Sequence, residues 1–451
     1  METSLSLRRR LGLGTATSVV VANMIGTGIF TTTGLMLAQL ESGWLVLLCW
    51  LVGGCVALCG ALSYAELGTM MPRAGGEYAY LREIYGPLPA FLTGWTSFFV
   101  GFSAPIAFAG VACAAYLVAA GVLPDGWWAR KGAALALILV FSAVHSVGVG
   151  LGARVQNALT GLKLLLLAGL LLLGFAVGRG DWHLLGPASE FWSSGHSSRL
   201  GIAMLWVMFA YSGWNASTYL GEEVEQPART LPRSLLLGTL TVTLIYAAVN
   251  LLFFFAAPMS ALAGQVAVGE VAARGLFGAE AARWLSVLIA LALLSSLSAW
   301  ILVGPRVYYA MARDALFFRF AARIHPRFET PALSVATQAA CAGVMVLSGT
   351  FDQLLTYIGF ALGIFPWMAV AGLLLLRRRA PARERPYRVW GYPVVPLFYL
   401  VAMTWILGVA FVNSPGPSIV ALLTVAAGIP VYRLAFARKQ SGQARFRTKD
   451  H

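Results

Sequence analysis

Long apolar runs separated by short polar stretches dominate the pattern of this chain. Each run is roughly 20 residues long, enough for an α-helix to cross about 30 Å of hydrocarbon. The runs are continuous rather than alternating, so they predict helices and not barrel strands. The sequence therefore predicts an all-α integral membrane protein with twelve transmembrane helices, at residues 15–38, 43–65, 88–121, 132–150, 157–178, 200–220, 235–256, 284–304, 333–350, 353–376, 395–412 and 419–435.

Two of these runs, 15–38 and 200–220, are interrupted near the middle by glycine-containing triplets. The triplets are Gly26-Thr27-Gly28 and Tyr211-Ser212-Gly213. A spanning helix normally closes its own backbone hydrogen bonds, because an unpaired N–H or C=O in hydrocarbon costs several kcal/mol. Interruptions at matching places in two halves of a chain predict a substrate site at mid-membrane, as in secondary transporters.

The first triplet would divide its helix into two half-helices. The half that begins near Thr27 exposes N–H groups and the positive end of its dipole, which suit a carboxylate. The half that ends near Met24 and Ile25 exposes carbonyls, which suit an ammonium group. The alternative is that these glycines only let neighbouring membrane helices pack closely.

The second triplet offers further carbonyls, at Phe209 and Ala210, because a second half-helix would end there. A free α-amino acid carries a carboxylate and an ammonium on one carbon, so one zwitterion would satisfy both interruptions. Phe209 is then a candidate lid over the site. The alternative for Phe209 is an ordinary lipid-facing or core aromatic residue.

The interrupted helices lead two successive groups of five, residues 15–178 and 200–376. Because five is odd, the second group begins on the opposite side of the membrane, and the two groups are predicted to form an inverted repeat. Two extra helices at 395–435 follow. With an N-terminal tail, 1–14, and a C-terminal tail, 436–451, the whole chain is expected to form a single transmembrane domain.

Composition and charge agree with a membrane protein and predict its orientation. Hydrophobic residues make up 59% of the chain and charged residues 11%, about half the charged fraction of soluble domains. The net charge of +14 comes from 32 Lys and Arg, most of which fall on the side of the N-terminus. The positive-inside rule therefore predicts a multi-pass protein of the cell membrane with both termini cytoplasmic, and no nucleic-acid partner is expected. The exceptions on the outer side are Arg130, Lys131, Arg179, Arg199, Arg274 and Arg283.

Several motifs, in this order, resemble one family. They are Gly26-Thr27-Gly28-Ile29-Phe30, Tyr64-Ala65-Glu66-Leu67, the stretch Pro72 to Tyr78, the run Phe209 to Asn215 with Glu222-Glu223, and the stretch Pro305 to Asp314. The chain resembles the amino acid-polyamine-organocation permeases, nearest to their L-type and cationic amino acid transporter branches. The resemblance spans residue 10 to about residue 376. It implies the five-plus-five inverted repeat, alternating access and amino acid transport.

The resemblance also implies the roles of individual positions. The carboxylate-binding loop would be Gly26, Thr27 and Gly28, and the aromatic gate Phe209. Ser212 stands where L-type relatives often have glycine, which narrows the pocket and leaves its side-chain preference open. The ammonium-binding carbonyls would be those of Met24, Ile25, Phe209, Ala210 and Ser212.

Cysteine positions bear on a covalent partner. Animal members of the resembling L-type branch join a heavy subunit through an external cysteine. Here all five cysteines fall inside predicted spans, so no disulfide-linked heavy subunit is expected. They are Cys49, Cys55, Cys59, Cys113 and Cys341.

Lys163 lies inside the fifth predicted helix, where a lysine is costly and usually faces a cavity or a partner. In the resembling family, a lysine in this motif takes the place of the sodium ion of sodium-coupled relatives and bridges the first and eighth helices. That implies sodium independence. The alternative is a side chain that snorkels to the membrane surface. The lysine would either carry a coupled proton, giving symport, or stay charged while amino acids exchange, giving antiport.

Acidic residues bear on the substrate. All of them fall in loops or at span ends, and none is expected at mid-bilayer near either interruption. A polyamine or a cationic side chain would need a buried counter-charge, so neutral amino acids are favoured over cationic amino acids or polyamines. Ser295, Ser296 and Ser298 in the eighth helix would line the site, or instead bond back to the preceding turn.

Other function classes are less compatible with this sequence. No HExxH or GxSxG motif occurs and the five histidines have no metal-ligand spacing, so an enzyme, a cofactor and a metal site are not expected. A channel would call for a ring of carbonyls or charges from a symmetric assembly. A single chain with two interrupted helices instead predicts an occluded carrier site.

Overall fold

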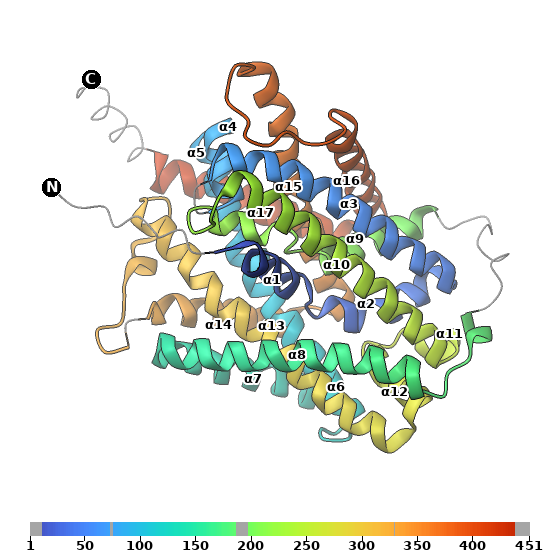
Figure 1. Cartoon of the computed structure of the whole chain (residues 1–451). Helices are drawn as coiled ribbons and strands as arrows, with labels where there is room; N and C mark the ends of the chain where they lie inside the picture. The colour runs from blue at the N-terminus through green and yellow to red at the C-terminus, as the bar shows by residue number, and fades with distance from the viewer. Residues whose placement is uncertain (1–10, 73–74, 186–196, 329, 438–451) are drawn as a thin grey trace, which may run out of the picture.

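The computed structural model describes residues 11–72, 75–185, 197–328 and 330–437, and this part of the chain is helical as predicted (Figure 1). The first half contains α1 (Leu13–Met24), α2 (Gly28–Leu40), α3 (Gly43–Met70), α4 (Glu77–Tyr85), α5 (Pro87–Thr96), η1 (Ser97–Ser103), α6 (Ala104–Ala119), α7 (Trp127–Val147), α8 (Val149–Val177) and η2 (Trp182–Leu185). The second half contains α9 (Ser197–Ala210), η4 (Ala216–Leu220), α10 (Pro227–Ala256), α11 (Met259–Leu262), α12 (Val268–Phe277), α13 (Ala279–Arg313), η5 (Arg319–Ala322), α14 (Ala332–Ser348), α15 (Phe351–Arg379), α16 (Val394–Asn413) and α17 (Pro415–Ala435). Most of the predicted tails lies outside the described residues.

Nine helices of the described chain are long and apolar enough to cross a membrane, and the bent pair α1 and α2 adds a tenth. The two remaining predicted spans, 200–220 and 333–350, coincide with shorter apolar helices, Arg199–Ala210 of α9 and Ala332–Ser348 of α14. The first of these ends at Ala210, directly before the predicted interruption, and turns with the 3₁₀-helix η4 take the place of the helix predicted to continue to residue 220. The exact number of twelve crossings stays a prediction.

The long predicted span 88–121 is a single rod, Pro87–Ala119. It widens into a π-helix over Ser97–Ser103, directly before Pro105. Proline has no N–H for the carbonyl four residues earlier, and a π-helical turn absorbs the mismatch. Ser103 Oγ donates to the Phe98 carbonyl at 2.7 Å inside this turn, so the proline loosens the rod without breaking it.

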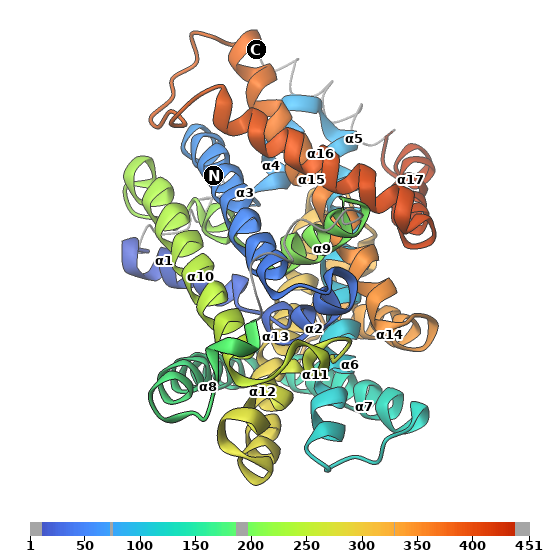
Figure 2. The same cartoon turned by 90° about the vertical axis from the view of Figure 1, so that its right-hand side faces the viewer.

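The helices pack so that both interrupted segments lie in the interior. Helices α1 and α3 both pack against α10, and α13 packs against α6 and α8 (Figures 1 and 2). Helices α16 and α17 form one flank, with α7 and α8 toward the opposite end (Figure 2). Met24, Ile25 and Tyr211 are buried as a result.

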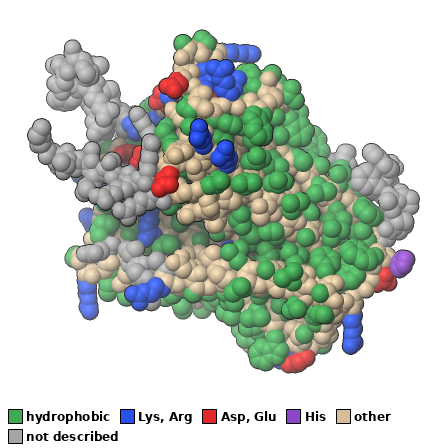
Figure 3. Space-filling view, viewed as in Figure 1, with side chains coloured by type: hydrophobic (Ala, Val, Ile, Leu, Met, Phe, Trp, Pro, Cys, Tyr) green, Lys and Arg blue, Asp and Glu red, His purple; other side chains and the backbone are tan. Residues whose placement is uncertain are grey.

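The surface has the pattern expected of a protein in a bilayer. Hydrophobic side chains cover much of the face shown in Figure 3, and charged side chains gather near its margins. Large apolar residues such as Leu165 and Val401 are exposed on long helices, where lipid would surround them. The cysteines lie in α3, α6 and α14, as predicted, and all five are free.

A buried ion cluster fixes the connection between α15 and α16. Glu66, fully buried near the end of α3, pairs with Arg377 and lies 3.5 Å from Arg385 Nε. Its Oε2 also accepts the Val389 N–H at 2.8 Å. A buried carboxylate needs this degree of compensation, and the cluster holds residues 380–393 against α3.

Candidate functional site

The first predicted interruption is present. Helix α1 ends at Met24, α2 begins at Gly28, and the two are bent by 42°. In the described part of the chain, the N–H groups of Gly26, Thr27 and Gly28 donate to no other backbone group, and the Thr27 side chain does not cap α2. The Gly26 N–H faces the Tyr246 hydroxyl, and those of Thr27 and Gly28 are donors at a helix N-terminus, where an anion is stabilised.

The second interruption is also present and lies directly against the first. Helix α9 ends at Ala210, and turns lead to η4 at Ala216. Gly213 has φ +98°, and a Cβ there would meet the carbonyl carbon of Asn23 at 2.9 Å. A Cβ on Gly28 would meet Ala210 Cβ at 2.5 Å. Only glycine allows these approaches, so both triplets serve a contact between the two breaks.

Gly26 differs from Gly28 and Gly213 because a Cβ added at Gly26 would fit without a clash. A Cβ there would find Met24 O at 3.8 Å and Ser296 Oγ at 3.9 Å as its nearest atoms. The Ser295 and Ser296 hydroxyls are buried and make no hydrogen bond to any residue that the structure describes, so they do not bond back to the preceding turn. A buried hydroxyl without a partner is costly and indicates a ligand or a water. Ser296 is therefore a candidate contact for a molecule held at Gly26.

Ser298, the third candidate, faces elsewhere. Its Oγ lies 2.8 Å from His145 Nε2 on α7. This pair joins two helices, α7 and α13, and leaves Ser298 without a free hydroxyl for the site.

The predicted carbonyl acceptors come together, and a tyrosine that the sequence did not single out joins them. The Tyr246 hydroxyl on α10 lies 2.5 Å from Met24 O and 3.0 Å from Ala210 O. One hydroxyl proton is shared between the ends of α1 and α9, so Tyr246 ties the two breaks. Phe209 O accepts the Ser212 N–H at 2.9 Å. Each carbonyl has a second lone pair, which leaves acceptor capacity for an ammonium group.

Lys163 is buried rather than snorkelling, with 4% of its surface exposed. Its Nζ donates to Ile25 O at 2.6 Å and to Ala22 O at 3.4 Å. A cation at the C-terminal end of α1 compensates both the free carbonyls and the helix dipole. Within the described chain no hydrogen bond joins Lys163 to α13, so only the α1 half of the expected bridge is present.

The α2 side of the site is closed. The Phe209 ring on α9 packs edge-on against Phe108, with centroids 5.2 Å apart, and Phe108 in turn lies 4.2 Å from Phe351. Three helices therefore contribute one aromatic layer, consistent with the predicted lid. Further out, the Gly264 N–H donates to Gly34 O at 2.7 Å, which fastens the connection between α11 and α12 over α2.

One acidic residue lies closer to a break than the sequence predicted. The Glu77 carboxylate accepts a hydrogen bond from Asn215 Nδ2 at 2.7 Å, two residues beyond Gly213. Burial raises the pKa of Glu77 to about 7, and hydrogen bonding by Tyr64, Tyr219 and Asn215 opposes this rise. The sequence placed Glu77 in a loop, and hydropathy does not reveal how the start of α4 folds back onto the segment before α10.

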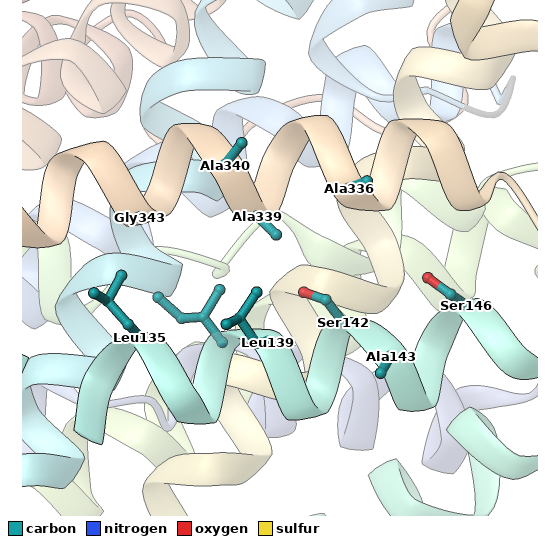
Figure 4. Close-up of a pocket in the computed structure, with 10 residues that line it drawn as sticks. Leu135, Leu139, Ser142, Ala143, Ser146, Ala336, Ala339, Ala340 and Gly343 are labelled. Atoms are coloured by element: carbon teal, nitrogen blue, oxygen red, sulfur yellow. The ribbon is translucent and has the colours of Figure 1, made fainter. Parts of the chain in front are cut away.

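A separate groove lies between α7 and α14 and has a volume of about 470 Å³ (Figure 4). Its lining is small and apolar apart from serine hydroxyls, with Leu139 and Ser142 facing Ala336 and Ala339. It includes no residue of α1, α2 or α9. The groove is therefore distinct from the site at the helix breaks.

Comparison with known proteins gives matches along nearly the whole chain. Residues 11–435 match the family described as amino acid permease. The serine/threonine exchanger SteT of Bacillus subtilis (strain 168) is 32% identical over 439 residues, which cover 96% of this chain and 98% of that protein. Human Asc-type amino acid transporter 1 is 30% identical over 436 residues, 95% of this chain and 82% of the relative. Human b(0,+)-type amino acid transporter 1 is 30% identical over 425 residues, 91% of this chain and 84% of the relative.

Proposed function

Because this chain belongs to the amino acid permease family, we propose that it carries free amino acids by alternating access and holds each one between the two helix breaks. The resemblance seen in the sequence motifs is confirmed by this match. The protein is an amino acid transporter of the membrane and not an enzyme.

The contact between the two breaks is the observation that carries the proposed binding mode. The N–H groups of Gly26, Thr27 and Gly28, which donate to no backbone carbonyl of the described chain, would hold the substrate carboxylate. Carbonyls at the ends of α1 and α9 would hold its ammonium group, and Phe209 would close over it. Opposite charges one carbon apart match donors and acceptors at adjoining helix ends. The proposed acceptors are those of Met24, Ile25, Phe209, Ala210 and Ser212.

The proposed transport mode is sodium-independent exchange, with proton-coupled symport as the other form. Lys163 places a fixed positive charge at the end of α1, which leaves no need for a metal ion there. SteT is a serine/threonine exchanger, which supports exchange and a neutral substrate. The alternative substrate is a cationic amino acid or a polyamine, for which the buried Glu77 would supply a counter-charge only after it loses its proton.

The remaining features of the proposal concern assembly and orientation. The two groups of five helices, 15–178 and 200–376, would form the inverted repeat of one domain. The protein would lie in the plasma or inner membrane of the cell, with both tails in the cytoplasm. All five cysteines are on membrane helices, which supports transport without a disulfide-linked heavy subunit.

Uptake into proteoliposomes tests this function. Labelled serine, leucine and arginine would be offered to vesicles with and without internal amino acid, in sodium and in choline buffers. The proposal expects saturable uptake of a neutral amino acid, stimulated by internal substrate and equal in both buffers. Uptake that rises linearly with concentration and ignores internal substrate would indicate a pore and contradict it.

A further inference from the structure

A carboxyl group is buried where α4 meets the segment after the second helix break. Glu77, the first residue of α4, is only 8% exposed although it lies outside the spanning helices. Asn215 Nδ2 donates to its Oε1 at 2.7 Å and also lies 3.3 Å from the Tyr219 hydroxyl. Glu77 therefore contacts the stretch between α9 and α10, residues 211–226, through a side chain two positions beyond Gly213.

Two glycines before α4 allow the start of this helix to lie very close to η4. Gly76 has φ +48°, and a Cβ there would come within 2.7 Å of the Tyr219 ring. The Gly75 N–H lies 3.4 Å from the Tyr219 carbonyl, to which it donates. Helix α4 thus starts directly against η4. Separation of these two elements would expose the Glu77 carboxyl to water.

The groups around Glu77 in the described chain offer it hydrogen bonds, from Tyr64, Tyr219 and Asn215, but no opposite charge. Its titratable neighbours are phenols, which stay neutral until about pH 10: Tyr64 on α3, Tyr80 on α4, Tyr219 on η4 and Tyr399 on α16. No lysine or arginine of the described chain pairs with Glu77, unlike Glu66, which holds two arginines. Burial therefore favours the neutral acid, and the pKa of Glu77 rises from 4.5 to about 7.

We propose that Glu77 is a proton-sensitive latch: its neutral form keeps α4 against the 211–226 segment, and loss of its proton favours separation of the two. The proposal rests on the transport function above, in which this segment carries the second break. A group that binds its proton more tightly when buried than when hydrated stabilises the closed contact at low pH. With pKa values of about 7 closed and 4.5 hydrated, the ratio of closed to open changes by about tenfold between pH 6 and pH 8.

Hydrogen–deuterium exchange of peptides within residues 211–226 measures this opening directly. In the purified protein in nanodiscs, after correction for the intrinsic effect of pH, protection is expected to fall by about tenfold from pH 6 to pH 8. Glu77→Gln keeps a carbonyl acceptor for Asn215 but does not ionise, so its protection is expected to be equal at both values. The matched control is Glu83→Gln on the same helix, whose carboxylate pairs with Arg383 at the surface and which keeps the wild-type response.

Transport gives an independent readout. Exchange in proteoliposomes is expected to vary with pH around 7 in the wild type and in Glu83→Gln, and to lose that dependence in Glu77→Gln. Should Glu77→Gln fail to fold, Glu77→Asp retains a titratable group and must retain a pH response.

Two results would overturn the latch: wild-type protection that is the same at pH 6 and pH 8, or a wild-type pH response in Glu77→Gln. A wild type that carries no amino acid at all would contradict the proposed function instead. The deuterium measurement on residues 211–226 would still decide the latch in that case.

Discussion

At the scale of single residues, the site depends on polar side chains inside apolar helices, where each one is costly unless it has a hydrogen-bond partner. Lys163 meets carbonyls at the end of α1, and Ser296 has no partner opposite Gly26. Lys163 could be singled out from the sequence, because a lysine in the middle of an apolar helix is unusual. Tyr246 could not be singled out, because a tyrosine among apolar neighbours is typical of ordinary packing and its partners lie 222 and 36 residues away.

Replacing Lys163 with alanine should abolish or uncouple uptake while the protein remains in the membrane. The change leaves the Ile25 carbonyl unpaired at the end of α1, and we expect at least a tenfold loss of transport, or about 1.4 kcal/mol. Lys131→Ala is the matched control, because Lys131 also donates to helix-terminal carbonyls, at Val346 and Gly349, away from both breaks. Uptake by K163A at the wild-type rate in reconstituted vesicles would refute the role given to this lysine.

Replacing Tyr246 with phenylalanine should raise the KM for the amino acid about fivefold. The variant loses the hydroxyl shared by Met24 and Ala210, and one neutral hydrogen bond contributes about 1 kcal/mol. Tyr308→Phe serves as the comparison, since the Tyr308 hydroxyl is buried without a partner and its removal should leave KM unchanged. Equal KM values for the two variants would show that the hydroxyl does not position the breaks.

At the scale of elements, both breaks and the end of α9 near Ala210 were predictable, and the structure that follows this end was not. Glycines inside long apolar runs marked both interruptions, because glycine weakens a helix and permits close backbone contact. The apolar run continues to residue 220, yet turns and the short 3₁₀-helix η4 follow Ala210 in place of a second α-helical half. Gly213 lies there so close to the backbone of Asn23 that a Cβ would strike it, and periodicity does not record such a tertiary contact.

Replacing Gly213 with alanine should therefore remove transport, because the new Cβ would separate the two breaks in addition to straining the backbone. Alanine at φ +98° is strained and its Cβ would also strike Asn23. Gly264→Ala separates the two effects, since Gly264 has φ +75° with nothing within 4 Å. We expect both variants to melt earlier and only G213A to lose uptake. Loss of uptake in G264A to the same extent would mean that general destabilisation accounts for the result.

At the scale of the whole molecule, hydropathy predicted the all-helical membrane architecture, and the order of motifs predicted the family. Neither hydropathy nor the order of motifs predicted which distant segments contact each other. Glu77 and Asn215 lie 138 residues apart, and the sequence placed the carboxyl in a solvated loop. The buried cluster of Glu66 with Arg377 and Arg385 was hidden for the same reason. Patterns of spacing within a helix describe its faces, whereas these contacts depend on how the helices are packed together.

The central claim is that peptide groups at the two breaks hold both charges of a free amino acid. Calorimetric titration of the purified protein with the best-transported amino acid, its N-acetyl derivative and its methyl ester tests this directly. The N-acetyl derivative lacks the ammonium charge, and the methyl ester lacks the carboxylate charge. The account therefore predicts that both bind at least a hundredfold more weakly than the free amino acid, with or without sodium. Binding of either derivative as tightly as the parent amino acid would contradict it.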